Sequence, residues 1–550
     1  MPIPQAADFY YLKNFQTVLD WVSGRYSDLL STQEISFVEQ FRTLPQSAQA
    51  LLVRMVMRKG SHFRLSKLVY DEIGCTETAA QPLIDLGWLS TEHPLSAAEL
   101  AKLLLKHELL GLLTESDSGS KLSKAALTEQ LEQQQSLAMP WQQWPQIPAD
   151  TLYSLTLGEL FDRFRLLFFG NLAQSWSEFV LADLGVFRYE QVRFSAQSRG
   201  FHSRRDIDDY LHLRRCREAF ADGASVADTL AQLGQFQSQN PWIEQRHQRL
   251  LFQLSQQLER DGALDEALLL YQQCRYTGAR QRQIRILEKT QQYDAAYKLA
   301  VQADASPENE AERQLVERAL RRLERKLKYA SSKEKKDIAT PEQRLQLPRQ
   351  PDTGVEQAVA MHFAEHDAPV YYVENTLICS LFGLLCWDAV FAPLPGAFFH
   401  PFHSAPADLH SSDFYSRRRN LFDHCLARLE SGEYLDCIRA VFQQKQGIQS
   451  PFVVWSMLSN ELLEQALTCI PAAHLKHWFE RLLGDIKASR AGMPDLIQFW
   501  PTERRYRMIE VKGPGDRLQD NQRRWLAFCA QHAMPVEVCY VQWSQEEREA

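Results

Sequence analysis

The stretch that decides the fold of the last domain runs Gly492-Met493-Pro494-Asp495-Leu496-Ile497-Gln498-Phe499-Trp500, then Pro501-Thr502-Glu503-Arg504, then Arg505-Tyr506-Arg507-Met508-Ile509-Glu510-Val511-Lys512. Two apolar and aromatic runs flank a short polar turn that contains a proline, a pattern typical of a β-hairpin. If the turn is centred between Thr502 and Glu503, Asp495 faces Glu510 across the two strands. Lys512 lies two positions further on and therefore points to the same side as Glu510.

Two carboxylates that face each other across a strand pair repel one another, and like charges in this position destabilise a sheet. A divalent cation removes the conflict, because Mg²⁺ binds through one or two carboxylates together with water and phosphate oxygens. A lysine beside the cation can stabilise negative charge that develops on phosphorus. The hairpin therefore predicts metal-dependent phosphoryl chemistry at Asp495, Glu510 and Lys512. Exposed charges on an ordinary strand are the alternative that the motif alone leaves open.

Length and composition restrict the class of protein. A chain of 550 residues is too long for one hydrophobic core, so we expect three or four domains. The net charge of −8 does not exclude a nucleic-acid partner, because binding depends on where positive charge gathers. Ten cysteines without a CxxC pair indicate reduced thiols. No secretory leader is visible, and the apolar stretch Asn375–Trp387 is too short to span a bilayer, so we interpret it as a buried helix.

The whole chain predicts a multidomain, mainly α-helical protein that ends in an α/β domain. We divide it into a helical or winged domain at 1–90, a DNA-binding region that resembles a SAP module at 91–240, a helical repeat similar to tetratricopeptide repeats at 241–340, and the α/β domain at 350–550. The SAP resemblance rests on two short helical stretches, Leu95–Leu104 and Leu127–Leu131, with Gly119-Ser120-Lys121 between them; any helical hairpin would look similar.

A residue pattern that occurs twice in the sequence, here called the internal echo, indicates the helical repeat. Leu258-Glu259-Arg260 with Asp265-Glu266-Ala267 is followed by Leu287-Glu288-Lys289 with Asp294-Ala295-Ala296. Small alanines at matching places let paired helices approach closely. After the repeat, residues 326–351 are rich in Lys, Glu and Gln, which favours a solvated connector.

Arginines interleaved with aromatic residues predict contacts with DNA phosphates, which would depend on salt and be largely blind to sequence. The candidates are Arg193, Arg199, Arg204, Arg205, Arg214, Arg215, Arg417 and Arg418. The alternative for the first six is a solvated helical face with local ion pairs to Asp206, Asp208 and Asp209.

Several of these motifs resemble known nucleases. Pro494-Asp495 with Glu510-Val511-Lys512 resembles the PD-(D/E)XK nuclease core, and Gly513–Leu518 with Gln522 and Trp525 resembles its VRR-NUC branch. More narrowly, the chain resembles the Fanconi-anaemia-associated nuclease family in a bacterial form. Further matching stretches are Arg58–Gly60, Leu167–Asn171, Asp183–Val186, Trp387–Phe391 and Phe414–Arg418.

The resemblance implies roles for individual residues. Asp495, Glu510 and the Val511 carbonyl would bind Mg²⁺ or Mn²⁺, and Lys512 would be the catalytic lysine. Glu374 matches the family's additional metal-binding glutamate, although a carboxylate at a helix start can also serve the helix dipole alone. Gln522 falls on the helix after the hairpin, where related nucleases carry a glutamine near the site; capping or packing is its alternative role.

The family also implies a structure-specific 5′-flap endonuclease with 5′-to-3′ exonuclease activity, acting on branched or flap duplex DNA in interstrand-crosslink repair. No Cys/His cluster for a ubiquitin-binding zinc finger is visible in the sequence. We expect an intracellular protein without a membrane segment, cytoplasmic and nucleoid-associated in a bacterium or nuclear in a eukaryote, with the oligomeric state open. A Holliday-junction resolvase and a non-catalytic DNA-binding scaffold of helical repeats are the rival functions.

Overall fold

The computed structural model describes residues 9–113, 122–174, 176, 187–329, 340–349 and 352–544. The chain divides into two compact units. The first contains Met1–Phe187 and Phe201–Ile207, and the second contains Arg188–Gly200 and Asp208–Ala550. Two stretches of the sequence analysis, Gly119–Lys121 and Asp183–Val186, lie outside the described residues.

Helices packed on a small antiparallel sheet open the first unit. They are α1 (Tyr10–Tyr26), α2 (Thr32–Thr43), α3 (Gln46–Val56) and α4 (Thr76–Asp85), with strands β1 (His62–Arg64), β2 (Leu89–Ser90) and β5 (Leu152–Leu155) in the order β1-β5-β2. A capping box between Ser31 and Glu34 sets the start of α2. β5 is the central strand of this sheet and follows residue 150, so the chain returns after the second small core to complete the sheet.

A second small core lies between β2 and β5 in the chain. It contains β3 (Pro94–Leu95), α5 (Ala97–Leu103), α6 (Lys106–Leu112), α7 (Lys124–Gln134) and β4 (Met139–Pro140). Trp141 and Trp144 are buried with leucines of α5 and α7, so these short helices share a core of their own. After β5, helix α8 (Gly158–Phe169) ends at Gly170, whose φ of 70° is the left-handed conformation usual at a helix end.

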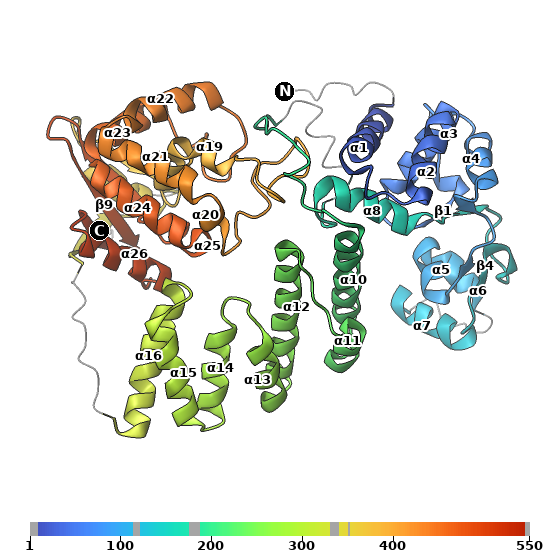
Figure 1. Ribbon diagram of the computed structural model, residues 1–550, viewed down its shortest axis with the longest axis horizontal. Helices are drawn as coiled ribbons and strands as arrows, with labels where there is room; N and C mark the ends of the chain where they lie inside the picture. The colour runs from blue at the N-terminus through green and yellow to red at the C-terminus, as the bar shows by residue number, and fades with distance from the viewer. Residues whose placement is uncertain are drawn as a thin grey trace, which may run out of the picture. The chain divides into compact units, whose positions relative to one another are not determined.

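Paired helices form the middle of the chain, as the internal echo predicted. They are α10 (Arg204–Ala221), α11 (Val226–Leu233), α12 (Pro241–Arg260), α13 (Leu264–Gln273), α14 (Ala279–Lys289), α15 (Tyr293–Ala305) and α16 (Glu310–Leu327). From α12 to α16 each helix packs on the next, drawn in green to yellow in Figure 1. Of the alanines that led to this prediction, Ala267 and Ala296 are fully buried, as a close approach of the helices requires, whereas Ala295 is exposed.

The last domain is built on a five-stranded mixed sheet with the order β6-β10-β9-β8-β7. Its strands are β6 (Glu342–Pro348), β7 (Val370–Tyr372), β8 (Leu496–Trp500), β9 (Arg505–Lys512) and β10 (Val536–Ser544). β7, β8 and β9 are antiparallel neighbours, whereas β10 is parallel to both β9 and β6. The predicted connector at 326–351 is therefore wrong in part, because Glu342–Pro348 is an edge strand of this sheet.

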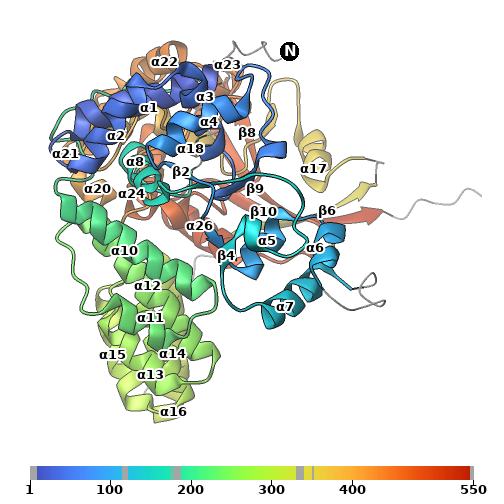
Figure 2. The same ribbon diagram turned by 90° about the vertical axis from the view of Figure 1, so that its right-hand side faces the viewer.

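Helices cover both faces of the sheet. They are α17 (Val355–Phe363), α18 (Leu377–Leu385), α19 (Trp387–Val390), α20 (Phe414–Arg417), α21 (Arg419–Ser431), α22 (Tyr434–Lys445), α23 (Asn460–Cys469), α24 (Ala472–Gly484), α25 (Ile486–Ser489) and α26 (Asp520–Gln531). Val359 of α17 packs on Leu496 and Ile509 at one face, and the larger core with α18 and α24 lies at the other (Figure 2). Every residue of α18 is buried, which confirms the predicted buried helix.

The helical repeat is fastened to helix α26 of the last domain. Arg318 of α16 donates two hydrogen bonds to the Asp520 carboxylate, at 2.7 and 2.9 Å. Arg524 of α26 donates to Gln314 at 2.8 Å, and Arg481 of α24 pairs with Glu310. The helix that follows the hairpin is thereby held from the side of the repeat.

All ten cysteines are free thiols, as expected. In the part of the chain that the structure describes, no helix combines the length and the apolar character needed to cross a membrane.

Candidate functional site

The hairpin has the predicted register. Leu496 pairs with Ile509 and Trp500 pairs with Arg505, so the residues that extend this ladder by one step are Asp495 and Glu510. Arg504 completes the turn with a φ of 51°. Asp495 stands immediately before β8 and Glu510 stands inside β9, next to the central core of the sheet.

The two carboxylates and Lys512 are buried together. Glu510 is 0% exposed, Lys512 is 7% exposed and Asp495 is 8% exposed. Lys512 Nζ donates to Glu510 Oε1 at 2.6 Å, and the Val511 main-chain N–H donates to Asp495 Oδ2 at 2.8 Å. Glu510 Oε2 is buried without a hydrogen-bond partner. An ionised oxygen in this position is costly unless a positive charge reaches it.

Burial also makes Asp495 and Glu510 weaker acids than exposed carboxyl groups. It raises the pKa of Glu510 to about 7, with a further contribution from the Asp495 charge and an opposing one from Lys512. Burial likewise raises the pKa of Asp495 to about 6; the Val511 hydrogen bond and Lys512 oppose the rise, and the Glu374 carboxylate adds to it. Two acids with raised pKa in one buried place are typical of functional sites.

This donor set fits a hard divalent cation. Such ions take carboxylate oxygens, and the partnerless Glu510 Oε2 beside Asp495 offers them in a buried setting. Across the described residues, no three Asp, Glu, His or Cys side chains are grouped so that they could hold one ion. The structure thus provides an acidic pair, to which water, phosphate or a main-chain carbonyl would add the remaining oxygens.

Glu374 lies near the pair, in the turn between β7 and α18. Its carboxylate contributes to the raised pKa of both Asp495 and Glu510, which places it within electrostatic reach of them. Tyr372 Oη donates to its Oε2 at 2.5 Å and Asn375 Nδ2 donates to its Oε1 at 3.0 Å. The predicted position at the start of the buried helix is confirmed, and its role as a ligand stays a prediction.

Gln522 lies in the first turn of α26 and is used there as a cap. Its Oε1 accepts from the Gln519 main-chain N–H at 2.9 Å, within a capping box. The structure therefore shows the capping role that the sequence left as an alternative, and a role in catalysis stays a prediction.

Glu356 is a neighbour that the sequence analysis missed. It lies in the first turn of α17, and its charge also raises the pKa of Asp495. The signal in the sequence is weak, because an acidic residue at a helix start is common for reasons of the helix dipole alone. Only the packing of α17 on the sheet brings it near the pair.

The arginines predicted to bind DNA fall into different classes. The prediction that Arg418 contacts DNA is wrong, because the residue is 1% exposed and both its terminal nitrogens donate to Asp408 at 2.8 Å. Arg417 also pairs with Asp408. Arg204 pairs with the buried Glu34 and Arg214 with Glu218. The outward-facing members are Arg193, Arg205 and Arg215, with Arg199 half-buried.

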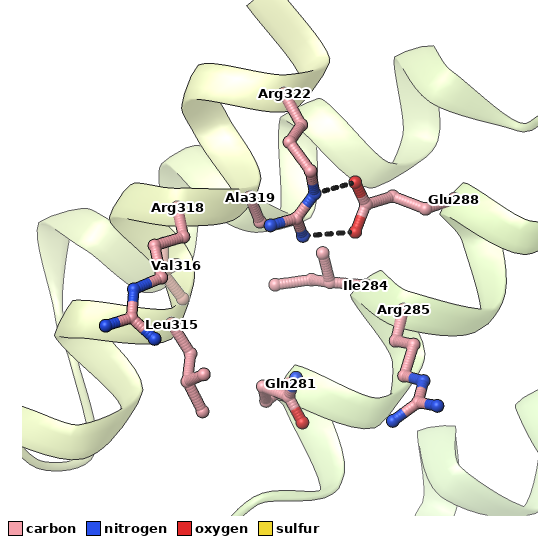
Figure 3. Close-up of a pocket in the computed structure, with 9 residues that line it drawn as sticks. All are labelled: Gln281, Ile284, Arg285, Glu288, Leu315, Val316, Arg318, Ala319 and Arg322. Carbon is pink, nitrogen blue, oxygen red and sulfur yellow. Dashed lines mark hydrogen bonds and ion pairs between the residues drawn. The ribbon is translucent and has the colours of Figure 1, made fainter. Parts of the chain in front are cut away.

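A pocket of about 320 Å³ lies between α14 and α16 of the repeat (Figure 3), and neither Asp495 nor Glu510 lines it. Ile284, Val316 and Ala319 line it with arginines, and Arg322 makes a two-pronged pair with Glu288 across its upper part. Its lining holds no acidic pair, so the candidate site is the end of the hairpin.

Comparison with protein families supports this placement. Residues 429–543 match the VRR-NUC domain, residues 94–144 match the Fanconi anemia-associated nuclease SAP domain, and residues 9–90 match the FAN1 HTH domain. The SAP match is much shorter than the predicted region 91–240, and the exact domain limits stay predictions.

Comparison with individual proteins gives similarity over the full length. The chain is 53% identical to a Fanconi-associated nuclease 1 homologue of Pseudomonas aeruginosa, over 98% of this chain and 97% of that protein. It is 25% identical to the homologue of Arabidopsis thaliana, over 98% of this chain and 68% of that one. A crystal structure of paFAN1 bound to DNA with a 2-nucleotide 5′ flap and a gap matches with a TM-score of 0.91 and 52% identity, covering 100% of both chains.

Proposed function

Because the chain belongs to the Fanconi-associated nuclease 1 family and is a structure-specific DNA nuclease, we propose that its substrate is duplex DNA with a 5′ flap. The flap assignment is supported by the DNA in the paFAN1 crystal structures, which carries a 5′ flap of one or two nucleotides. A 5′-to-3′ exonuclease activity, action in interstrand-crosslink repair, and a location with the chromosomal DNA complete the proposal; the family resemblance supports them.

The single observation that carries the chemistry is that Asp495, Glu510 and Lys512 are buried together at the end of the hairpin. Asp495 and Glu510 would hold the divalent ion, with the Val511 carbonyl as a further oxygen. When bound, the ion supplies Lewis acidity, which polarises the phosphate and makes a water molecule more acidic. We assign this ion as Mg²⁺ or Mn²⁺, because both take oxygen ligands.

Lys512 is positioned to stabilise negative charge that develops near Glu510. Its ammonium lies 2.6 Å from Glu510 Oε1 and is held on a strand, so little reorganisation is needed when charge grows nearby. With the Glu510 charge balanced by a bound cation, the Lys512 ammonium would be available to donate to a phosphoryl oxygen and to stabilise the additional negative charge there. Gln522, at the start of α26, would orient water or phosphate if its cap opens.

In this proposal, outward-facing arginines bind the phosphates of the DNA backbone. Arg193, Arg205 and Arg215 face solvent, and Arg199 is half-buried. Their contacts would be electrostatic and independent of base sequence. The helical segment that matches a SAP domain adds a second surface for the duplex.

A cleavage assay on four labelled DNAs tests the function: a 5′ flap, a 3′ flap, a four-way junction and a linear duplex, each with Mg²⁺, Mn²⁺ or chelator. The decisive variant is Asp495→Asn, which keeps an acceptor for the Val511 N–H and removes the charge. We expect cleavage of the 5′ flap to fall at least about a thousandfold, since a charged metal ligand is lost, while DNA binding stays intact.

The matched control is Glu503→Gln, which removes an exposed carboxylate from the turn of the same hairpin. It should cleave like the wild type. Paired cuts in the four-way junction with no preference for flaps would establish a resolvase instead, and unchanged cleavage by Asp495→Asn would refute the assignment of the site. A protein that binds branched DNA without any metal-dependent cleavage would be a scaffold.

A further inference from the structure

One side chain joins the two turns that carry Glu374 and Asp495. Asn375 Nδ2 donates to Glu374 Oε1 at 3.0 Å, and Asn375 Oδ1 accepts from the Met493 main-chain N–H at 3.1 Å. The φ of Asn375 is 55°, a left-handed conformation that Asn adopts far more readily than most residues. A single amide therefore contacts one acidic side chain and the main chain that leads to another.

The turn before Asp495 is fixed from the opposite side as well. Gly492 has a φ of 88°, and a Cβ at this position would lie 2.8 Å from the main-chain carbonyl carbon of Asn521 at the start of α26. Two further hydrogen bonds hold Asp495 itself: its main-chain oxygen accepts from Val373 N at 2.8 Å, and its Oδ2 accepts from Val511 N at 2.8 Å. Asp495 is thus bonded to the residue that follows β7 and to β9, and the turn before it lies close to the start of α26.

Each of the two carboxylate oxygens of Glu374 accepts a hydrogen bond. It lies among acids, since its charge raises the pKa of Asp495 and of Glu510, and like charges push a half-exposed side chain away. Tyr372 and Asn375 each donate to one of its two oxygens. Asn375 is the donor of the two that also touches the turn before Asp495.

We propose that Asn375 is a positioning residue of the nuclease centre, which sets the place of the Glu374 carboxylate relative to Asp495 by bonding to both turns. The inference rests on the proposed metal-dependent function. Asn375 contacts neither the reacting atoms nor the acidic pair; it acts through Glu374 and through the Met493 main chain. Its loss should weaken use of the metal more than binding of DNA.

The test is Asn375→Gly in the full chain, measured as the Mn²⁺ concentration that gives half-maximal cleavage of a 5′ flap. Glycine accepts the left-handed backbone and removes both hydrogen bonds. We expect this concentration to rise about tenfold, the effect of losing hydrogen bonds to a charged group, with KM for DNA unchanged. The control is Arg504→Gly, which places glycine at another left-handed position, in the exposed hairpin turn; it should leave the metal dependence unchanged.

A double-mutant cycle with Glu374→Gln separates positioning from a general effect on folding. In the Glu374→Gln background, Asn375→Gly should change the metal dependence by about threefold at most, because the effect through the Glu374 carboxylate is already lost and only the hydrogen bond from the Met493 main chain remains to be removed. Full additivity, or an unchanged metal dependence of Asn375→Gly alone, would overturn the proposal. If the wild-type protein itself shows no metal-dependent cleavage, the proposed function is refuted. This outcome can be told apart from a failure of the Asn375 proposal, which concerns only the variants.

If Asn375→Gly does not fold, Asn375→Asp takes its place. Aspartate still accepts from the Met493 N–H and tolerates the backbone conformation, but it repels Glu374 where the amide attracted it. We expect the Mn²⁺ concentration for half-maximal cleavage to rise about tenfold, as for Asn375→Gly; a wild-type metal dependence would overturn the proposal.

Discussion

Glu510 makes a specific prediction about stability against pH. The change is Glu510→Gln, which keeps an acceptor for Lys512 and removes the titratable group. Burial raises the pKa of Glu510 to about 7 in the folded protein, whereas an unfolded glutamate titrates at about 4.3. The folded state therefore binds the proton more tightly, so the wild type loses stability as the pH rises from about 4 to 7 and then stays at the lower level.

The size of the loss follows from the two pKa values. Linkage gives roughly 2 to 3 kcal/mol between pH 5 and pH 8. For a domain of this kind, that corresponds to roughly 5 to 10 °C in Tm. In the presence of a chelator, Glu510→Gln should therefore gain about this much on the wild type when the pH changes from 5 to 8. Any effect of the substitution that does not depend on pH cancels in the comparison.

Thermal unfolding followed by circular dichroism at pH 5, 6, 7 and 8 measures the difference. Saturating Mn²⁺ at pH 8 should stabilise the wild type and not Glu510→Gln, because an ion that binds only the folded state adds stability. A Tm difference between the two proteins that is the same at pH 5 and pH 8 would refute the reasoning, since it would mean that Glu510 titrates normally in the fold.

Two substitutions elsewhere test the packing. Gly492→Ala should cost about 2 kcal/mol more than Gly515→Ala: both glycines have a φ of 88° and share the left-handed strain, but only the first would press its Cβ into α26, while the second has open space around it. Equal losses in chemical denaturation would contradict this. Arg418→Met should cost about 3 kcal/mol, because it leaves Asp408 short of a buried partner, whereas the exposed Arg193→Met should change the free energy of unfolding by less than about 0.5 kcal/mol; equal effects in urea titrations would rule out the buried pair.

The hairpin could be predicted from the sequence because its information is local. Two apolar and aromatic runs mark β8 and β9 as strands, and the short turn fixes their register, so Asp495 and Glu510 could be placed opposite each other. The spacing of Glu510 and Lys512 then follows from the strand geometry alone. The helical repeat and the buried helix α18 were predictable for the same reason.

Other features depend on partners far away in the chain. Exposure alternates along β6, but Leu347 is its one buried residue, so the sequence marks it only weakly as a strand; its pairing with β10 defines it. Arg418 has the composition of a surface residue, and only the fold places Asp408 against it in the core. Glu356 and Asn375 likewise gain their meaning from the approach of α17 and of the turn before β8.

The edge strand β6 has a practical consequence for dividing the protein. The strand precedes α17 and pairs along Val538–Ser544, so a nuclease fragment cut at the apparent start of the domain, near residue 350, would strip one side of β10. Unpaired N–H and C=O groups along a strand invite pairing between copies of the fragment. A stable excised nuclease has to begin upstream of Glu342, and one that begins after Pro348 should aggregate at concentrations where the longer fragment stays dispersed.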